Sequence, residues 1–417
     1  MPAPRILPAT RLEVDLDALS HNVALVRGLL AAGASGGQTP ALAAVIKADA
    51  YGLGALPVAR ELVRSGVDLL AVARLGEALE LVRGFAAADR GAADRGAAAA
   101  PTPILVMGHT PDEELEAAVA AGVRVTIFDE RQAAELSRAA LALGKPARAH
   151  VKVDTGMNRL GLKPDADTTE LLARMAGKPG LELEGIFTHL ALCDAESDRR
   201  QFELFTRVVA EAEGRGLRFA YKHVCDSIGL CRYPAWRLDL VRAGAILFGA
   251  KPGNAPLAAD LDLRAPFAFK TRVSRLRPVA EGEGVGYDYT WRAPPGGARI
   301  ATLPVGYVDG YRRCLSNKAE VLVRGRRARV VGLVCMDQLV VDVTNIPGAA
   351  EGDEVLLFGR SGEGELGLLE VAGWAGTNRN EILASIGRRV PRVYFRGGEP
   401  VETVDYLDPH PSQGARP

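Results

Sequence analysis

The chain has 417 residues, with 51 Lys and Arg balanced by 51 Asp and Glu, so its formal net charge is zero. This length exceeds the roughly 100–200 residues of one ordinary domain, and two domains are expected. A chain without net charge has no general attraction to nucleic acid or to an anionic membrane, which argues against both as partners.

The sequence pattern shows neither the apolar core of a signal peptide nor closely spaced pairs of cysteines. Residues 1–8 lack the continuous apolar core of a signal peptide, and no run of about 18 uncharged apolar residues follows. The five cysteines form an odd, scattered set without Cys-x-x-Cys spacing. We therefore expect a cytoplasmic protein with reduced thiols and no metal site.

The first 250 residues alternate short apolar runs with helical patterns. A strand is predicted at 12–17, followed by a helix with Asp17 as its N-cap. Eight further strands are predicted at 44–46, 69–73, 104–107, 123–128, 149–153, 185–188, 221–224 and 243–249. This number favours an α/β fold with an N-terminal (β/α)8 (TIM) barrel over 13–252, with a doubly wound open sheet as the alternative. A tandem Ala-Ala-Asp-Arg-Gly repeat within 86–100 predicts an exposed insertion.

The hydrophobic pattern of the sequence changes after residue 252. Short runs rich in Val, Leu and Ile, separated by Gly, Pro and Asp, predict a mainly antiparallel β domain over 253–408. Its strands are expected at 267–273, 298–304, 320–323, 328–334, 339–343 and 354–358. One helix is predicted at 368–375, residues 1–12 are a candidate addition to this domain, and 409–417 are expected to form a tail.

Lys47 follows an apolar run and precedes glycines, which by itself describes a strand that ends in a solvated loop. The surrounding residues 45–54 read Val-Ile-Lys-Ala-Asp-Ala-Tyr-Gly-Leu-Gly. They resemble the pyridoxal 5′-phosphate (PLP) lysine motif of the alanine racemase family. The resemblance implies that Lys47 binds PLP covalently and acts as a base, and that Tyr51 contacts the cofactor phosphate.

A second motif, Lys-Val-Asp-Thr-Gly-Met-Asn-Arg-Leu-Gly, occupies 152–161. It is similar to the family segment whose arginine binds the phenolic oxygen of the cofactor and the substrate carboxylate, which assigns both roles to Arg159. In many members the lysine that matches Lys152 is carbamylated. A carbamate would place an anion beside Arg159 and orient it.

Arg242 lies inside an apolar run, where a buried guanidinium needs an acceptor. The resemblance places Arg242 against the pyridine nitrogen of PLP and has His189 hydrogen-bonded to it. Because a guanidinium gives up no proton near neutrality, the ring nitrogen stays unprotonated, and proton return to Cα is favoured over transamination. By the same resemblance Ser227, Gly244 and Ala245 bind the phosphate.

Racemisation needs a second base, because the α-proton leaves one face of the substrate and returns on the other. The segment Glu-Gly-Val-Gly-Tyr-Asp-Tyr-Thr at 283–290 resembles the loop of the family's catalytic tyrosine, which assigns this role to Tyr287 with Tyr289 as rival. The motifs Gly-Tyr-Val-Asp-Gly at 306–310 and Cys-Met-Asp-Gln at 335–338 imply substrate contacts by Tyr307 and Met336. In the family these residues reach the other subunit, so a homodimer with shared active sites is implied.

Three positions depart from the family pattern. Arg388 stands where many members have a phosphate-binding tyrosine, and is expected to bind the phosphate in its place. Asp226 replaces a common asparagine and Ala245 a common isoleucine. We expect interconversion of L-alanine and D-alanine, which supplies D-alanine for peptidoglycan. The alternatives are a serine or broad-spectrum racemase, a PLP-dependent decarboxylase and a non-catalytic PLP-binding protein. The decarboxylase is disfavoured because its cysteine and aspartate motifs differ from the residues found at 287–289 and 335–337. The non-catalytic protein is disfavoured because it would need no β domain.

Overall fold

The computed structural model describes residues 7–33, 38–92, 102–253, 255–258, 260–362 and 364–408. The chain forms two compact units, and each is described by itself. Unit 1 comprises residues 1–18, 51–54 and 265–417, and unit 2 comprises residues 19–50 and 55–264.

Unit 2 contains eight parallel strands in the order β8-β7-β6-β5-β4-β3-β2-β9. They are β2 (Ala41–Val45), β3 (Leu69–Val72), β4 (Ile104–His109), β5 (Arg124–Ile127), β6 (Ala147–Lys152), β7 (Leu181–Phe187), β8 (Tyr221–His223) and β9 (Leu240–Ala243). Two backbone hydrogen bonds join the ends of this order, from Asp239 N to Lys222 O (3.1 Å) and from Arg242 N to Cys225 O (3.0 Å). The predicted barrel is confirmed, and the open-sheet alternative is wrong.

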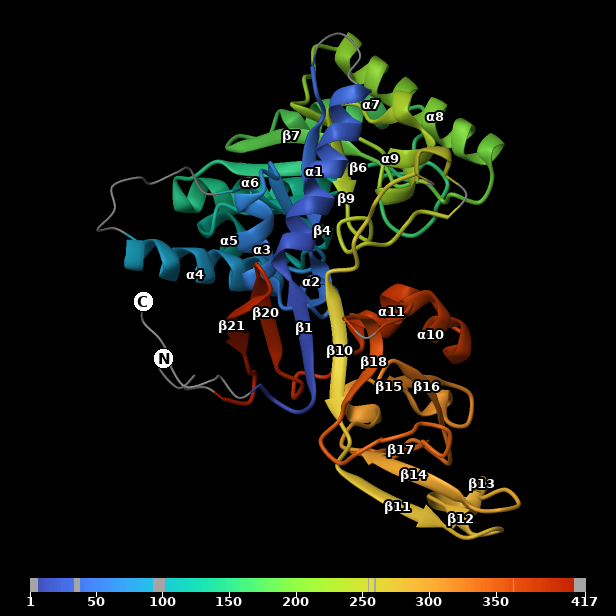
Figure 1. Ribbon diagram of the computed structural model, residues 1–417. Helices are drawn as coiled ribbons and strands as arrows, with labels where there is room; N and C mark the ends of the chain where they lie inside the picture. Colours follow the sequence, from blue (N-terminus) through green and yellow to red (C-terminus); the bar gives the residue numbers. More distant parts are fainter. Residues whose placement is uncertain are drawn as a thin grey trace. The chain divides into compact units, whose positions relative to one another are not determined.

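The helices of unit 2 lie outside the strands (Figure 1). They are α1 (Leu16–Ala32), α3 (Ala55–Arg64), α4 (Leu75–Ala92), α5 (Asp112–Ala120), α6 (Glu130–Leu143), α7 (Thr168–Ala176), α8 (Ala195–Gly214) and α9 (Ser227–Arg232). Helix α6 shows how the sequence sets these elements. The carboxylate of Asp129 accepts from Gln132 N at its start, and Gly144 ends it in the left-handed conformation. Its buried residues recur at helical spacing, which directs one face toward the sheet.

Three predicted elements of the barrel half need correction. Asp15, rather than Asp17, caps α1, because its Oδ1 accepts from the N–H groups of Asp17 (2.9 Å) and Ala18 (3.0 Å). The last barrel strand is Leu240–Ala243 rather than 243–249, since the chain turns directly after Ala243. Residues 86–92 of the predicted insertion continue α4, whereas 93–100 lie outside the described residues.

Unit 1 is built on an eleven-stranded sheet in the order β11-β14-β17-β16-β15-β18-β10-β1-β20-β21, with β19 paired to β18. The strands are β1 (Arg11–Asp15), β10 (Phe267–Arg272), β11 (Arg275–Val279), β14 (Ala298–Leu303), β15 (Glu320–Val323), β16 (Arg326–Val330), β17 (Leu339–Asp342), β18 (Glu354–Ser361), β19 (Gly364–Leu366), β20 (Arg392–Arg396) and β21 (Glu399–Val404). The β1–β20 pair is parallel, and the other neighbouring strands named in this order pair antiparallel. The predicted antiparallel β fold is confirmed.

Ion pairs hold β1 in this sheet. Lys270 Nζ lies 2.9 Å from Glu13 Oε2 and 2.9 Å from Glu354 Oε1. Arg11 Nη2 lies 2.5 Å from Glu354 Oε2, so opposite charges alternate across β1, β10 and β18.

Unit 1 also contains two helices and a small separate sheet. The predicted helix is α10 (Leu368–Ala375), and a second helix, α11 (Arg379–Ala384), was not predicted. The short hairpin β12 (Gly284–Val285) and β13 (Trp291–Arg292) forms a separate two-stranded sheet.

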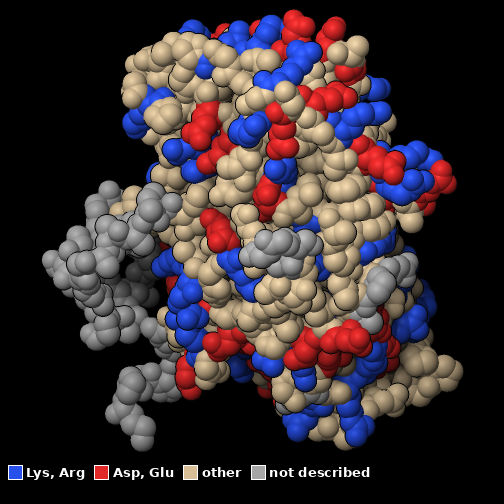
Figure 2. Space-filling model, turned by 90° about the horizontal axis from the view of Figure 1, so that it is seen from above, with Lys and Arg blue, Asp and Glu red and all other residues tan. Residues whose placement is uncertain are grey.

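Acidic and basic side chains intermingle on the face drawn in Figure 2. Strand β3 is entirely apolar and all four of its residues are buried, as expected for a parallel strand that is covered on both faces. Among the described helices, none combines the length and apolar character needed to cross a bilayer.

Candidate active site

Lys47 begins a turn with an unusual backbone. In α2 (Lys47–Tyr51) the φ angles of the four residues after Lys47 are 55°, 56°, 53° and 58°, which is a left-handed helical turn. None of these residues is glycine, and left-handed helix costs about 1–2 kcal/mol per residue for L-amino acids. Such strain persists only where the surroundings impose it, and it is typical of functional sites.

The carboxylate of Glu77 holds this turn from the start of α4. Its Oε1 accepts from Ala48 N (2.6 Å), and its Oε2 accepts from Ala73 N (2.8 Å) and Arg74 N (3.1 Å). Asp49 Oδ1 accepts from Ala55 N (2.6 Å) and ties the turn to α3. The turn Lys47–Tyr51 is therefore held by two carboxylates.

Cationic side chains gather at the C-terminal ends of the barrel strands. Lys152 ends β6, Arg159 follows it, and Arg242 lies in β9. Burial, followed by the charges of Arg242 and Arg159, lowers the pKa of Lys152 to about 8. Lys152 Nζ and Arg242 Cζ lie 5.1 Å and 5.3 Å from the centre of the Phe187 ring. Among the described residues, none forms an ion pair with Lys152 or Arg159. An anionic ligand would satisfy this cluster.

His189 lies close enough to this cluster for its pKa to respond to four cations. Burial and then the charges of Arg242, Lys152, Arg159 and Lys47 lower its pKa to about 3. A histidine that feels all four cations is neutral, and it shows that these four side chains, predicted separately, share one region of unit 2.

Arg242 is buried and fully oriented. Its Nη2 donates to the carbonyls of Thr188 (2.9 Å) and Val224 (2.8 Å), and its Nη1 donates to His223 Nδ1 (2.9 Å). The hydrogen bond that the resemblance gave to His189 is therefore made by His223, which is a correction. Acceptors in the described part of the chain take three of the five N–H groups of the guanidinium, so two remain for another acceptor.

Small groups at the ends of β8 and β9 form a cradle. Ser227 Oγ accepts from the backbone N–H groups of Gly244 (3.0 Å) and Ile246 (3.4 Å), and Ala245 lies between these two residues. The carboxylate of Asp226 caps α9, since its Oδ1 accepts from Ile228 N and Gly229 N at 2.9 Å each. A hydroxyl beside several backbone N–H groups suits a phosphate.

Tyr287 and Tyr289, the two candidate bases of unit 1, differ in their surroundings. Both belong to the 3-10 turn η4 (Tyr287–Tyr289) and are exposed, by 66% and 59%. The ring of Tyr289 packs over Gly284, where an added Cβ would lie 2.3 Å from the ring, and Arg292 lies above it. Among the described residues, none makes a ring contact or hydrogen bond with Tyr287. The local packing occupies Tyr289 and leaves Tyr287 available.

Tyr307 and Met336 lie on two loops that are joined by backbone hydrogen bonds. Tyr307 N donates to Cys335 O (3.0 Å) and Val308 N donates to Met336 O (3.2 Å). Glycine is required at 306, because a Cβ there would lie 2.2 Å from Met336 O. Tyr307 and Met336 are exposed by 38% and 50%.

Arg389 clamps these two loops, and sequence reasoning missed it. Its Nε and Nη2 donate to Asp309 at 2.6 Å and 3.0 Å, and its Nη2 also lies 2.7 Å from Asp337 Oδ1. The neighbouring Arg388 stacks instead on Tyr406, with its Cζ 4.7 Å from the ring centre. Tyr51, with Arg388, belongs to unit 1.

The other missed residues are inside the barrel. His150, Glu184 and His223 are hydrogen-bonded in series beneath Arg242. The spacing of His150 two residues before Lys152 could have revealed the first, because alternate residues of a strand point to the same side.

Comparisons with known proteins cover almost the whole chain. The models of "Alanine racemase, N-terminal domain" and "Alanine racemase, C-terminal domain" match residues 14–252 and 267–394. An alanine racemase of Desulfovibrio desulfuricans is 40% identical over 386 residues, covering 92% of this chain and 97% of that protein. An alanine racemase structure from Clostridium difficile has a TM-score of 0.88 at 34% identity, covering 97% of this chain and 100% of that one. One from Bartonella henselae with covalently bound pyridoxal phosphate has a TM-score of 0.78 at 26% identity, covering 93% and 100%.

Proposed function

The chain belongs to the alanine racemase family, and from that premise we propose that it interconverts L-alanine and D-alanine with PLP, using Lys47 and Tyr287 as its bases. As a member of this family it is a racemase, of the isomerase class. The observation that carries the proposal is the cationic cluster of Lys47, Lys152, Arg159 and Arg242 at the C-terminal ends of the barrel strands, where the active sites of such barrels lie.

The residues of this cluster fit PLP. Lys47 would hold it covalently, Ser227 with the N–H groups near Gly244 would bind the phosphate, and Arg242 has two N–H groups left for the ring nitrogen. Tyr51 and Arg388 are further candidates for the phosphate by the family resemblance. When bound, PLP supplies an electron sink that makes the α-proton of an amino acid removable.

Side chains of this protein then transfer the proton and determine where it returns. Lys47 Nζ takes the α-proton of one enantiomer or returns it, and Tyr287 Oη does so on the opposite face, as two-sided proton transfer requires. Arg159 binds the substrate carboxylate, assisted by Met336, while Tyr307 contacts the substrate. Arg242 donates hydrogen bonds without giving up a proton, and neutral His189 adds no proton of its own, so the proton returns to Cα.

A homodimer with shared sites completes the proposal. Lys47 lies in unit 2 and Tyr287 in unit 1, and the family resemblance pairs Lys47 of one subunit with Tyr287 of the partner. Exposed Tyr287, Tyr307 and Met336 support this arrangement, because apolar surface of this kind is typical of an interface. The product D-alanine would serve peptidoglycan synthesis, and a cytoplasmic location fits that use.

Chiral chromatography of reactions with L-alanine tests the activity. The PLP-loaded protein should convert L-alanine to an equal mixture of enantiomers, and Lys47→Ala and Tyr287→Phe should each lower kcat/KM by roughly a thousandfold or more, as loss of a catalytic group does. Tyr289→Phe is the matched control and should remain active. L-serine, measured beside L-alanine, tests the broad-spectrum alternative. Absence of D-alanine from the loaded wild-type protein would reject the function.

A further inference from the structure

A series of hydrogen bonds leads from Arg242 into the interior of the barrel. Arg242 Nη1 lies 2.9 Å from His223 Nδ1, and His223 Nε2 lies 2.9 Å from His150 Nδ1. His150 Nε2 lies 3.1 Å from Glu184 Oε2. Four strands, β9, β8, β6 and β7, each contribute one member, and both imidazoles are fully buried.

The two ends of the series fix its direction. A guanidinium only donates, so His223 Nδ1 must accept and the proton of neutral His223 lies on Nε2. His223 then donates to His150 Nδ1, which places the proton of His150 on Nε2, facing the carboxylate. Burial lowers the pKa values of both histidines, in agreement with neutral rings. With both imidazole protons on Nε2, each donor of the series faces an acceptor, and no other placement of these protons achieves this.

Glu184 supplies the negative end. Although burial raises its pKa, hydrogen bonds from His150 and Arg124 lower the pKa of Glu184 to about 2. Arg124 binds both of its oxygens, with Nε 3.0 Å from Oε2 and Nη2 3.1 Å from Oε1, and Arg148 Nε lies 3.9 Å from Oε1. The carboxylate is therefore ionised and held by one imidazole and two guanidinium groups.

The strand pairing is distorted at this residue. Ala149 of β6 pairs with Leu183 of β7, but the next residue, His150, pairs with Gly185. Glu184 is thus the extra residue of a β-bulge, and bulges re-aim side chains. Two successive residues of β7 face the interior here, since Glu184 contacts His150 and a Cβ on Gly185 would point at the same ring.

Gly185 provides the space for the imidazole. A Cβ at this position would lie 2.6 Å from Nδ1, 2.8 Å from Cε1 and 2.9 Å from Cγ of His150. Any larger residue would displace the ring and break its bond to His223. The bulge and the glycine together make room for the carboxylate of Glu184 and the imidazole of His150 in the interior of the barrel.

We propose that Glu184 is a positioning residue of the racemase, which acts through His150 and His223 to fix the guanidinium of Arg242. The proposal rests on the proposed function, because it concerns the two N–H groups that Arg242 has left for the cofactor. The anion polarises the imidazole N–H groups in series, so that His223 Nδ1 becomes a stronger acceptor for Arg242. Without the anion, only the guanidinium end still orients the two imidazoles, and His223 Nδ1 is a weaker acceptor for Arg242.

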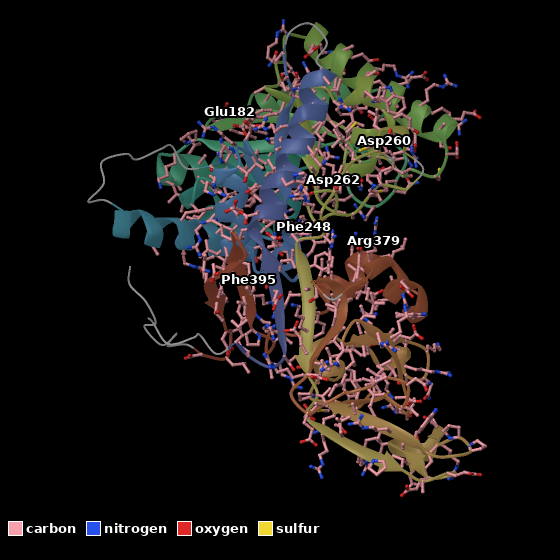
Figure 3. The ribbon with its side chains drawn as sticks, viewed as in Figure 1. Glu182, Phe248, Asp260, Asp262, Arg379 and Phe395 are labelled. Atoms are coloured by element: carbon pink, nitrogen blue, oxygen red, sulfur yellow. The ribbon has the colours of Figure 1, made fainter. Side chains whose placement is uncertain are left out.

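Glu184→Gln removes the charge with little change of shape. Its amide oxygen can still accept from His150, but the NH2 group then opposes Arg124. In the reversed orientation the NH2 group donates to His150 Nε2, which forces both protons onto Nδ1, and His223 then opposes Arg242. Glu182→Gln is the matched control, because Glu182 (labelled in Figure 3) lies on the same strand, is exposed and pairs with Arg148.

Imidazole ¹⁵N–¹H correlation spectra of the PLP-loaded protein, with ¹⁵N-labelled histidine, read the proton positions without any turnover. In the wild-type protein and in Glu182→Gln, His150 and His223 should both be neutral Nε2–H forms between pH 6 and pH 9. In Glu184→Gln the Nδ1–H form should be present. A wild-type His223 in the Nδ1–H form would overturn the proposal, and this measurement needs no variant to fold.

Alanine racemisation gives the second readout. Glu184→Gln should lower kcat by roughly tenfold to a hundredfold, the size expected when a group that orients a first-contact residue is lost, with little change in KM. Glu182→Gln should match the wild-type rate. A Glu184→Gln protein with wild-type kcat would overturn the positioning role. A wild-type protein that racemises nothing would reject the proposed function instead, and the spectra would still decide whether Glu184 sets the proton positions.

Discussion

The side-chain amine of Lys152 is buried near the cations Arg242 and Arg159, and this environment favours its reaction with carbon dioxide. Burial with Arg242 and Arg159 lowers its pKa to about 8. At pH 7.5 roughly a quarter of such an amine is neutral, against about one in a thousand at the ordinary pKa near 10.4. The neutral amine forms a carbamate and releases one proton, which replaces a cation by an anion beside Arg159 and Arg242.

We therefore predict that Lys152 is carbamylated. With ¹³C-bicarbonate, the wild-type protein should give a carbamate carbon signal that is absent from Lys152→Ala. Its intensity should rise from pH 7 to pH 9, since deprotonation through a pKa of about 8 supplies the reactive amine. Lys178→Ala, which removes a partly exposed lysine that pairs with Glu130, is the control. An unchanged spectrum in Lys152→Ala would contradict the prediction.

Glu77 is predicted to maintain the strained turn after Lys47. Glu77→Ala leaves three backbone N–H groups without their acceptor, and each unsatisfied donor costs about 1–3 kcal/mol where water does not replace it. We expect a lower unfolding temperature, faster amide hydrogen exchange at 48–50 and weaker retention of PLP. Glu113→Ala, at an exposed position in the first turn of α5, should leave all three unchanged. Equal exchange rates at 48–50 in the two variants would show that Glu77 does not hold the turn.

Most of the candidate site residues could be proposed from sequence because each stands in a contiguous motif. Lys47, Arg159, Tyr287 and Met336 are of this kind. His223 could not, because its role depends on which side chain reaches Arg242 across neighbouring strands. The resemblance offered His189 for that bond, and only the geometry of β8 and β9 distinguishes the two histidines.

At the level of secondary structure, alternating apolar runs and helical patterns were sufficient to predict the barrel. The bulge at Glu184 was not predictable, since it is a property of the pairing between β6 and β7. A strand with regular alternation would place residues 182, 184 and 186 on one side. In the structure the phase changes after Glu184, so that Phe187 stacks on His223 with ring centres 4.6 Å apart.

Gly185→Ala should destabilise the barrel through this bulge. The new Cβ meets a rigid imidazole rather than a flexible chain end, and overpacking of this kind costs about 1–3 kcal/mol. Gly28→Ala, inside α1 with open space around the new Cβ, should instead stabilise the protein by about 0.5–1 kcal/mol. Chemical denaturation at one protein concentration measures both. A Gly185→Ala protein as stable as wild type would show that the ring of His150 has room to move.

At the scale of the whole molecule, a single chain exposes five apolar side chains on or beside the loops of unit 1 that contain predicted site residues. They are Tyr287, Tyr289, Tyr307, Val308 and Met336. Covering them in a symmetric dimer would bury apolar surface and, by the family resemblance, bring Tyr287 to the partner subunit's Lys47. Each dimer would then contain two composite sites.

Mixing two inactive variants tests this arrangement. Lys47→Ala and Tyr287→Phe homodimers should each be nearly inactive, because every site lacks one base. After subunit exchange at equal amounts, about half of the dimers are mixed, and each mixed dimer has one intact site and one doubly altered site. Roughly a quarter of the wild-type activity should therefore return. If both bases came from the same chain, every site in the mixture would still lack one, so full exchange without recovery would exclude shared sites.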